Sequence, residues 1–169
     1  LPSTLQVKIE ERDPYAIWQN KRKTFVVDSE GVVLAPALPQ AYPRLPLVVG
    51  EGAGKHAAAL YEMLAPYKEL RSRMLAALRV GDRRWTIKLR TGTEVKLPDG
   101  SVNMALDALQ KLEQERGVLQ QDIAAIDLRL LDRITLRLRE TTAISADDAA
   151  PTEMPTSATG TTNQPDGQT

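Results

Sequence analysis

The chain has 169 residues, and its 22 lysines and arginines equal its 22 aspartates and glutamates, so its formal net charge is zero. A balanced charge supplies no net positive field to gather nucleic acid, and the absence of cysteine excludes disulfides, thiolate zinc sites and thiol catalysis. No apolar run approaches the roughly 20 residues needed to span a bilayer. Because the sequence starts at Leu1 without methionine and enters a strand pattern at once, we expect a piece of a longer protein.

Short strands and turns dominate the first part of the chain. Apolar and polar residues alternate over Leu5–Glu10, which predicts a strand with one wet face that ends at Asp13-Pro14. Ala16–Trp18 is predicted to be extended again. Thr24–Val27 and Val32–Leu34 flank a turn with a late glycine, which indicates a hairpin.

The middle of the chain combines a loop, a strand and helices. Four prolines between residues 35 and 46 fix φ and remove amide donors, so this stretch is predicted to be a loop. Leu47–Val49 is predicted to be a strand, and the apolar spacing after it indicates a helix that begins near Lys55. Pro66 breaks or kinks that helix, and for residues 67–80 the pattern leaves helix and strand both open.

A second hairpin and a longer helix follow. Residues 85–89 alternate as a half-buried strand does, and Thr91-Gly92 turns the chain into a partner strand over residues 95–97. Apolar residues then recur at helical spacing from Ser101, which can cap the helix, to Gly117, which can end it.

Residues 125–139 predict two consecutive half-buried strands. The apolar face of the first comprises Ile126, Leu128 and Leu130, and that of the second comprises Ile134, Leu136 and Leu138. Residues 141–169 almost lack large apolar side chains, so we expect a disordered tail. A last strand followed by such a tail leaves one row of backbone donors and acceptors available, which makes it a template for a partner's strand.

The turn from Gly50 to Lys55 offers an alternative, a nucleotide-binding enzyme. A strand, a glycine-rich turn and a helix are the setting of a phosphate-binding loop, but the spacing does not fit a Walker A motif. Val49 stands where the first glycine is needed, and His56 stands where a serine or threonine would bind magnesium. We interpret the glycines as structural, and we expect no enzyme activity, no cofactor and no metal site.

Arg83 and Arg84 stand beside Trp85 at the entrance to a predicted strand. Arginines at such a position are common at protein interfaces and equally common on any surface. We keep both interpretations, partner contact and a plain strand entrance with Trp85 buried.

Five segments in one order resemble the periplasmic part of the FtsQ/DivIB family of bacterial cell-division proteins. They are Leu5–Trp18, Val27–Val33, Leu45–Gly50, Arg83–Leu89 and Ile126–Arg129. Together they span about residues 5 to 139.

The resemblance implies an α+β fold, in which a curved mixed β-sheet is packed with two or three helices. Residues 1–13 would then hold the last strand of a POTRA domain, residues 14–140 an FtsQ-type β-domain, and residues 141–169 the tail. The family is anchored in the inner membrane by a single helix, which would lie upstream of Leu1. This portion would lie in the periplasm, at the division septum.

The resemblance also implies a non-enzymatic divisome scaffold that recruits FtsB, and through it FtsL, by strand addition near the last strands. The edge predicted from the residues alone falls at the same place. The candidate partner-binding residues are Arg83, Arg84, Leu130, Ile134, Thr135, Leu136, Arg137 and Leu138. Leu130 and Leu138 are the expected apolar anchors, and the chain departs from the family in that leucines replace the aromatic residues often seen around this edge.

Overall fold

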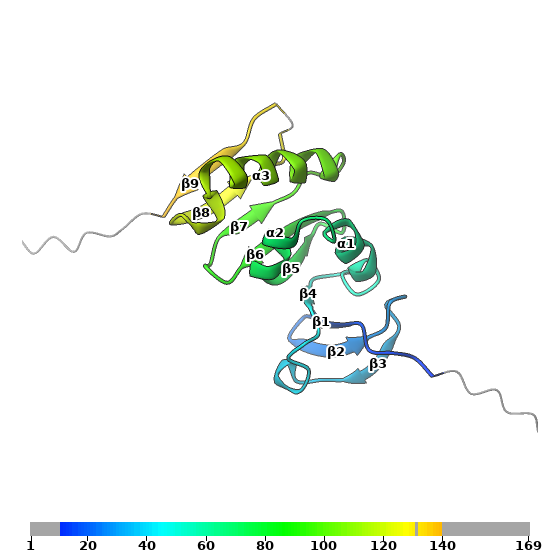
Figure 1. Ribbon diagram of the computed structural model, residues 1–169. Helices are drawn as coiled ribbons and strands as arrows, with labels where there is room; N and C mark the ends of the chain where they lie inside the picture. Colours follow the sequence, from blue (N-terminus) through cyan, green and yellow to red (C-terminus); the bar gives the residue numbers. More distant parts are fainter. Residues whose placement is uncertain (1–10, 131, 140–169) are drawn as a thin grey trace, which may run out of the picture. The chain divides into compact units, whose positions relative to one another are not determined.

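The computed structural model describes residues 11–130 and 132–139, which form one mixed sheet with helices packed on it (Figure 1). The strands are β1 (Ala16–Asn20), β2 (Lys23–Val27), β3 (Val33–Pro36), β4 (Leu47–Val49), β5 (Met74–Val80), β6 (Arg84–Leu89), β7 (Glu94–Lys96), β8 (Ile123–Asp127) and β9 (Thr135–Leu138). The helices are α1 (Ala57–Met63), α2 (Lys68–Arg73) and α3 (Val102–Arg116), with short 3₁₀ turns η1 (Pro39–Ala41) and η2 (Val118–Gln120).

The strand order is β3-β2-β1-β4-β5-β6-β7-β8-β9. The pairs β1–β4, β4–β5 and β7–β8 are parallel, and the other neighbours are antiparallel. Parallel neighbours need a crossover, and here α1 and α2 connect β4 to β5 while α3 connects β7 to β8. The α+β class predicted from the sequence is confirmed.

One row of apolar side chains crosses most of the sheet. Directly paired residues on neighbouring strands share a face, and the register joins Val48, Ala77, Ile87, Val95 and Ile126 in this way. Each of these five side chains is completely buried. The row continues to Leu136 on β9, where it ends.

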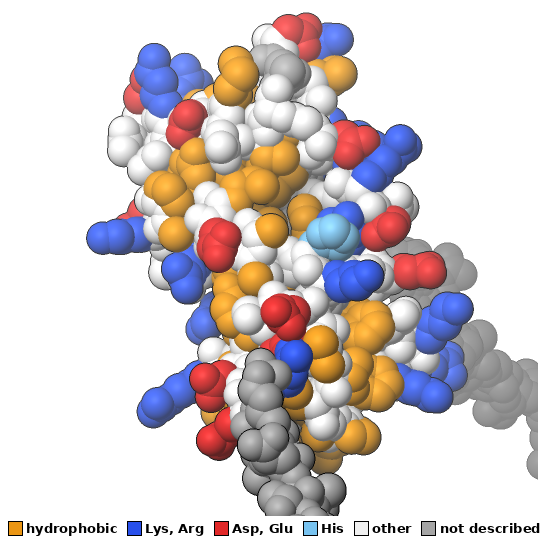
Figure 2. All heavy atoms as spheres, turned by 90° about the vertical axis from the view of Figure 1, so that its right-hand side faces the viewer, with side chains coloured by type: hydrophobic (Ala, Val, Ile, Leu, Met, Phe, Trp, Pro, Cys, Tyr) orange, Lys and Arg blue, Asp and Glu red, His pale blue; other side chains and the backbone are white. Residues whose placement is uncertain are grey.

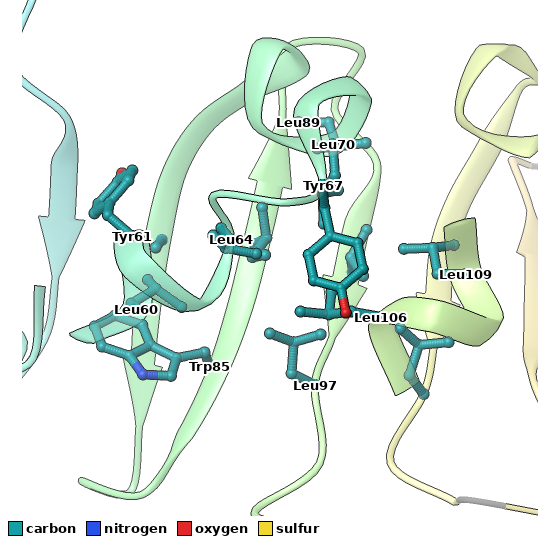
Figure 3. Packing of buried hydrophobic residues seen from close by; sticks show 14 of the residues in the cluster. Leu60, Tyr61, Leu64, Tyr67, Leu70, Trp85, Leu89, Leu97, Leu106 and Leu109 are labelled. Carbon is teal, nitrogen blue, oxygen red and sulfur yellow. The ribbon is translucent and has the colours of Figure 1, made fainter. Parts of the chain in front are cut away.

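The three helices bury this row. Leu60 of α1, Leu64 just after it, Leu70 of α2, and Leu106 and Leu109 of α3 belong to the same buried cluster as the row (Figure 3). Removing apolar surface from water contributes roughly 25 cal/mol per Å², so this packing is the main stabilising term of the fold.

Tyr67 connects two of the helices. Its hydroxyl donates a hydrogen bond of 2.6 Å to Oδ1 of Asp107 on α3, and Figure 3 shows the ring directed toward that helix. Burial, together with the bond to Asp107, raises the pKa of Tyr67 to about 12. The phenol therefore stays a donor at neutral pH.

Several sequence-based boundaries can be compared with the structure, and β3 extends to Pro36, into the stretch predicted to be a loop. Gly117 ends α3 with φ +60°, and its N–H donates to the Glu113 carbonyl at 2.8 Å, as predicted. The predicted cap at Ser101 is wrong, because this residue has φ +53° and its side chain makes no capping bond. The stretch 67–80, left open above, is α2 followed by β5.

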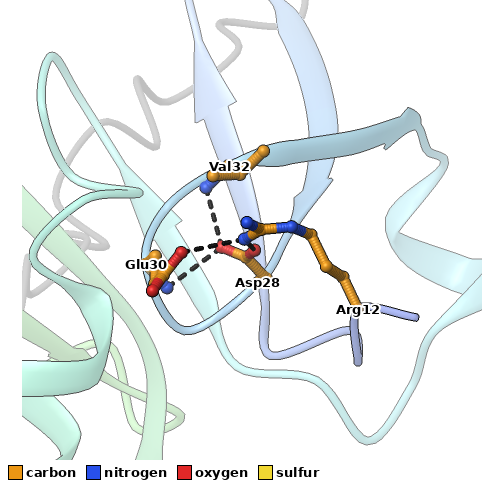
Figure 4. Close-up of polar contacts among 4 residues, drawn as sticks. All are labelled: Arg12, Asp28, Glu30 and Val32. Carbon is orange, nitrogen blue, oxygen red and sulfur yellow. Dashed lines mark hydrogen bonds and ion pairs between the residues drawn. The ribbon is translucent and has the colours of Figure 1, made fainter. Parts of the chain in front are cut away.

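The hairpin of β2 and β3 is organised by Asp28. Its Oδ1 accepts backbone N–H bonds from Glu30 at 3.0 Å and Val32 at 2.8 Å, and Arg12 pairs with both Asp28 and Glu30 (Figure 4). Burial alone would raise the pKa of Asp28, but the bonds from Arg12, Val32 and Glu30 lower it below its usual value. The carboxylate thus holds the turn from Asp28 to Val32, which contains Gly31.

Residues 1–10, which carry the predicted POTRA strand, and the predicted tail at 141–169 lie outside the described residues. In the described ranges, no helix combines the length and apolar character that crossing a bilayer requires.

Gly31→Ala is expected to destabilise the fold more than Gly81→Ala. Both glycines have positive φ, +83° and +60°, which costs an alanine about 1 kcal/mol. A Cβ at Gly31 would also lie 2.5 Å from the Lys55 Cα, whereas one at Gly81 meets nothing within 4 Å. Urea unfolding of both variants measures the difference, and equal losses of stability would contradict the contact.

Candidate partner-binding edge

β9 is the last strand of the sheet. It pairs with β8 in antiparallel fashion, with Ala125 opposite Arg137 and Ile126 opposite Leu136. Among residues 11–130 and 132–139, no strand pairs with its outer side. The predicted open edge therefore exists in the described part of the chain.

The backbone of β9 turns its free groups outward at Leu136 and Leu138. The Arg139 N–H donates to the Asp122 carbonyl on the β8 side at 3.1 Å. Because N–H and C=O directions alternate along a strand, Arg137 and Thr135 also face β8, while Leu136 and Leu138 face the open side.

The last strand is more exposed than predicted. We expected a half-buried strand, but all four residues of β9 are exposed, with Leu136 at 38% and Leu138 at 69%. Only Ile134, just before the strand, is half-buried and packs on the core. The reason is that the buried apolar cluster ends at Ile126 and Leu128, so the alternating pattern of β9 has no cover.

The strand before it is shorter than predicted. β8 ends at Asp127, and the Arg129 backbone N–H and guanidinium both donate to the Asp127 carboxylate. The Leu128 N–H still donates to the Lys96 carbonyl on β7 at 2.9 Å, and from Arg129 on this local bonding replaces the sheet ladder. Leu128 is still buried, but Leu130 lies outside the strand and is 54% exposed.

An apolar groove lies between α3 and the segment that enters β9. Its lining residues are Met104, Ala105, Ala108, Leu128, Leu130 and Ile134. The α3 residues were missed in the sequence, although Met104, Ala105 and Ala108 are apolar residues beside the main stripe of the helix. Met104 is 65% exposed, which is unusual for a large apolar side chain and marks a surface suited to a partner.

Arg84 joins the predicted site, whereas Arg83 does not. Arg84 lines a depression on the opposite face of the sheet together with Asp127, Arg129, Leu130 and Thr135. Arg83 lines neither this depression nor the groove, and its guanidinium lies 3.7 Å from the Asp99 carboxylate. Leu130 lines both the depression and the groove.

The glycine-rich turn is used for packing. Its Gly50 carbonyl accepts the indole N–H of Trp18 at 2.8 Å, and a Cβ at Gly54 would lie 3.2 Å from the Trp18 ring. The helix that follows, α1, has seven residues. Nothing in the described ranges favours the nucleotide-binding alternative.

The lone histidine, His56, is exposed, and Figure 2 shows it near acidic and basic side chains of the same face. No group of three or more His, Cys, Asp or Glu side chains is placed to hold a metal ion within the described ranges. The concentration of unused backbone groups and exposed leucines at β9 is therefore the best candidate site.

Residues 16–129 match the family described as "Cell division protein FtsQ/DivIB, C-terminal". The chain belongs to this family. It is 40% identical over 139 residues to the cell division protein FtsQ of Rhizobium radiobacter, covering 82% of this chain and 66% of that protein. It is 39% identical over 140 residues to FtsQ of Caulobacter vibrioides, covering 83% and 46% respectively.

The chain spans about half the length of most of these FtsQ relatives, for example 44% of FtsQ from Agrobacterium fabrum. The major extracytoplasmic domain of DivIB from Geobacillus stearothermophilus aligns with a TM-score of 0.40 at 16% identity, over 64% of this chain and 97% of that one. The sequence matches confirm the predicted family, whose printed description is that of a cell division protein.

Arg129→Gln is expected to raise the pKa of Asp127. The hydrogen bond from Arg129 is the largest cause that lowers this pKa, with the charge of Lys96 adding to it. A carboxylate with a lowered folded pKa stabilises the fold above its unfolded pKa, and that contribution is lost as pH falls through the folded value.

Carboxyl-carbon NMR titration between pH 2 and 6 measures the Asp127 pKa. Arg133→Gln is the matched control, since Arg133 pairs with Asp132 at 3.8 Å instead. If the Asp127 pKa is the same in the Arg129→Gln variant as in the unchanged chain, the assigned interaction is contradicted.

Proposed function

We propose that this chain is a non-enzymatic divisome scaffold that recruits FtsB, and through it FtsL, by β-strand addition to β9. The observation that carries the proposal is the open edge, where Leu136 and Leu138 direct backbone donors and acceptors away from the sheet. An extended peptide can satisfy those groups with main-chain hydrogen bonds.

The apolar row explains how an added strand would be selected. In the described part of the chain the row ends at Leu136, which keeps 38% of its surface exposed because no further strand of that part covers it. A partner strand would place a side chain beside Leu136, and an apolar one would continue the row and bury both. Main-chain bonds would supply affinity, and this position would supply specificity.

The groove on α3 extends the surface beyond the strand. Met104 and Leu130 are 65% and 54% exposed, and Leu130 and Ile134 continue directly toward β9. A partner that adds a strand at β9 can therefore bury further apolar side chains in the groove. Leu130 and Leu138 serve as apolar anchors in this proposal, as expected from the sequence.

Charged residues on the face of the sheet opposite the helices would set the orientation of the partner. Arg84, Thr135 and Arg137 lie on the face that the helices leave open, because Thr135 and Arg137 alternate with the leucines of β9. We expect carboxylates of the partner near Arg84 and Arg137. Arg83, paired with Asp99, would contribute less than the sequence suggested.

We further propose that the chain is the periplasmic part of a single-pass inner-membrane protein at the septum. Family membership supports this placement. The division into a POTRA strand at 1–13, a β-domain at 14–140 and a tail at 141–169 belongs to the same proposal.

Leu136→Pro is expected to weaken binding of the FtsB segment from the same organism by at least about tenfold, since it deletes an outward amide donor at the centre of the edge. The fold should persist because this N–H points away from β8, toward the open side of the described sheet. Isothermal titration measures affinity, and circular dichroism measures folding.

Arg137→Pro is the matched control, because it deletes an N–H that faces β8. It should lower the melting temperature, whereas Leu136→Pro should leave it nearly unchanged. A folded Leu136→Pro variant that binds FtsB normally would refute the assignment of the edge.

A further inference from the structure

A second concave surface lies away from β9, between the loop that enters β4, the helices α1 and α2, and the start of β5. Three arginines line it, Arg44, Arg71 and Arg90. We call this surface the arginine cleft. None of its lining residues belongs to β9 or to the groove on α3.

The fold brings these arginines together from distant parts of the chain. Arg90 follows β6, and its backbone N–H donates to the Arg73 carbonyl at the end of α2 at 2.9 Å. This bond holds Arg90 beside the helix that carries Arg71. Arg44 arrives from the proline-rich loop before β4.

Within the described residues, the charges in the cleft are not neutralised. Across residues 11–130 and 132–139, Arg44, Arg71 and Arg90 form no salt bridge, although Arg79, Arg129 and Arg139 each pair with an aspartate. Among the residues that the structure describes, no aspartate or glutamate lines the cleft. Three like charges facing one concavity favour an anionic ligand.

Tyr61 gives a second, independent sign of a ligand. It lines the cleft with only 7% of its surface exposed, and its hydroxyl has no hydrogen-bond partner in the described part of the chain. A buried polar group without a partner costs free energy, and a ligand acceptor would remove that cost. Burial raises the pKa of Tyr61, so the hydroxyl is a donor at neutral pH.

The other walls are apolar. Pro46, Met74 and Leu75 line the cleft, and Leu75 is 54% exposed. Guanidinium groups match carboxylates in paired hydrogen bonds, while these walls suit an aliphatic side chain. A polypeptide can enter the concavity and reach Tyr61, whereas the flat surface of a membrane cannot.

We propose that the arginine cleft binds an acidic peptide segment of a partner protein, with Asp or Glu carboxylates on the arginines and Tyr61 and an apolar side chain on Met74 and Leu75. This site is separate from the strand-addition edge. Variants at β9 should therefore leave it unaffected.

The test is fluorescence anisotropy of the full chain with a labelled, end-blocked peptide, Glu-Leu-Asp-Glu-Leu-Glu. Arg71→Glu combined with Arg90→Glu should weaken binding at least about tenfold, since two cationic hydrogen-bond donors are replaced by carboxylates that repel the peptide. Arg22→Glu combined with Arg116→Glu changes the net charge equally at exposed residues outside the cleft and should change affinity less than about twofold.

Tyr61→Phe separates a ligand contact from a structural role. It should weaken peptide binding about three- to tenfold while the melting temperature stays the same or rises, because the hydroxyl has no partner to lose among the described residues. A lower melting temperature with unchanged binding would overturn its role as a ligand donor.

Two further results would overturn the proposal. One is equal affinity for the Gln-Leu-Asn-Gln-Leu-Gln peptide. The other is sedimentation with phosphatidylglycerol vesicles that depends on Arg71 and Arg90 while the acidic peptide does not bind. Leu136→Pro, which tests the other site, should leave peptide affinity unchanged.

Discussion

The apolar row through Val48, Ala77, Ile87, Val95 and Ile126 is the constraint on which the rest of this domain depends. Every strand must keep its register for these side chains to share one face, since a slip by one residue would turn them to the other. The helices cover the row only as far as Ile126. Beyond Ile126 the backbone pairing continues to β9, but the helices no longer cover the side chains. The residues of β9 are therefore exposed.

Much of this arrangement could be read from the sequence because it depends on local patterns. Alternation identified the strands around Trp85–Leu89, prolines marked the loop before β4, and Gly117 marked the end of α3. The last strand was also located correctly. The exposure of this strand was not predicted correctly. Alternation indicates which residues share a face, but it does not indicate whether another element covers that face.

The remaining features depend on contacts between distant segments. Asp127 and Arg129 close on each other at the end of β8, so Leu130 leaves the strand that its apolar character predicted. The groove beside Met104 needs α3 and the segment before β9 to meet, and the arginine cleft needs Arg44 and Arg90 to meet. No pattern within one segment contains that information. The family resemblance predicted the overall fold, but it did not predict these contacts between distant segments.

The exposure of β9 has a dynamic consequence. A strand without buried side chains is held mainly by its hydrogen bonds to β8 and by the contacts of Arg139 with Asp122 and Thr91 at its end. Its local opening should therefore require less free energy than unfolding of the helix-covered strands, and its amides should exchange with solvent sooner. A ligand that binds β9 only while the strand is paired with β8 would raise the free energy of this local opening by mass action. Ligand binding at the edge could therefore be followed as slower amide hydrogen exchange at Thr135 and Arg137.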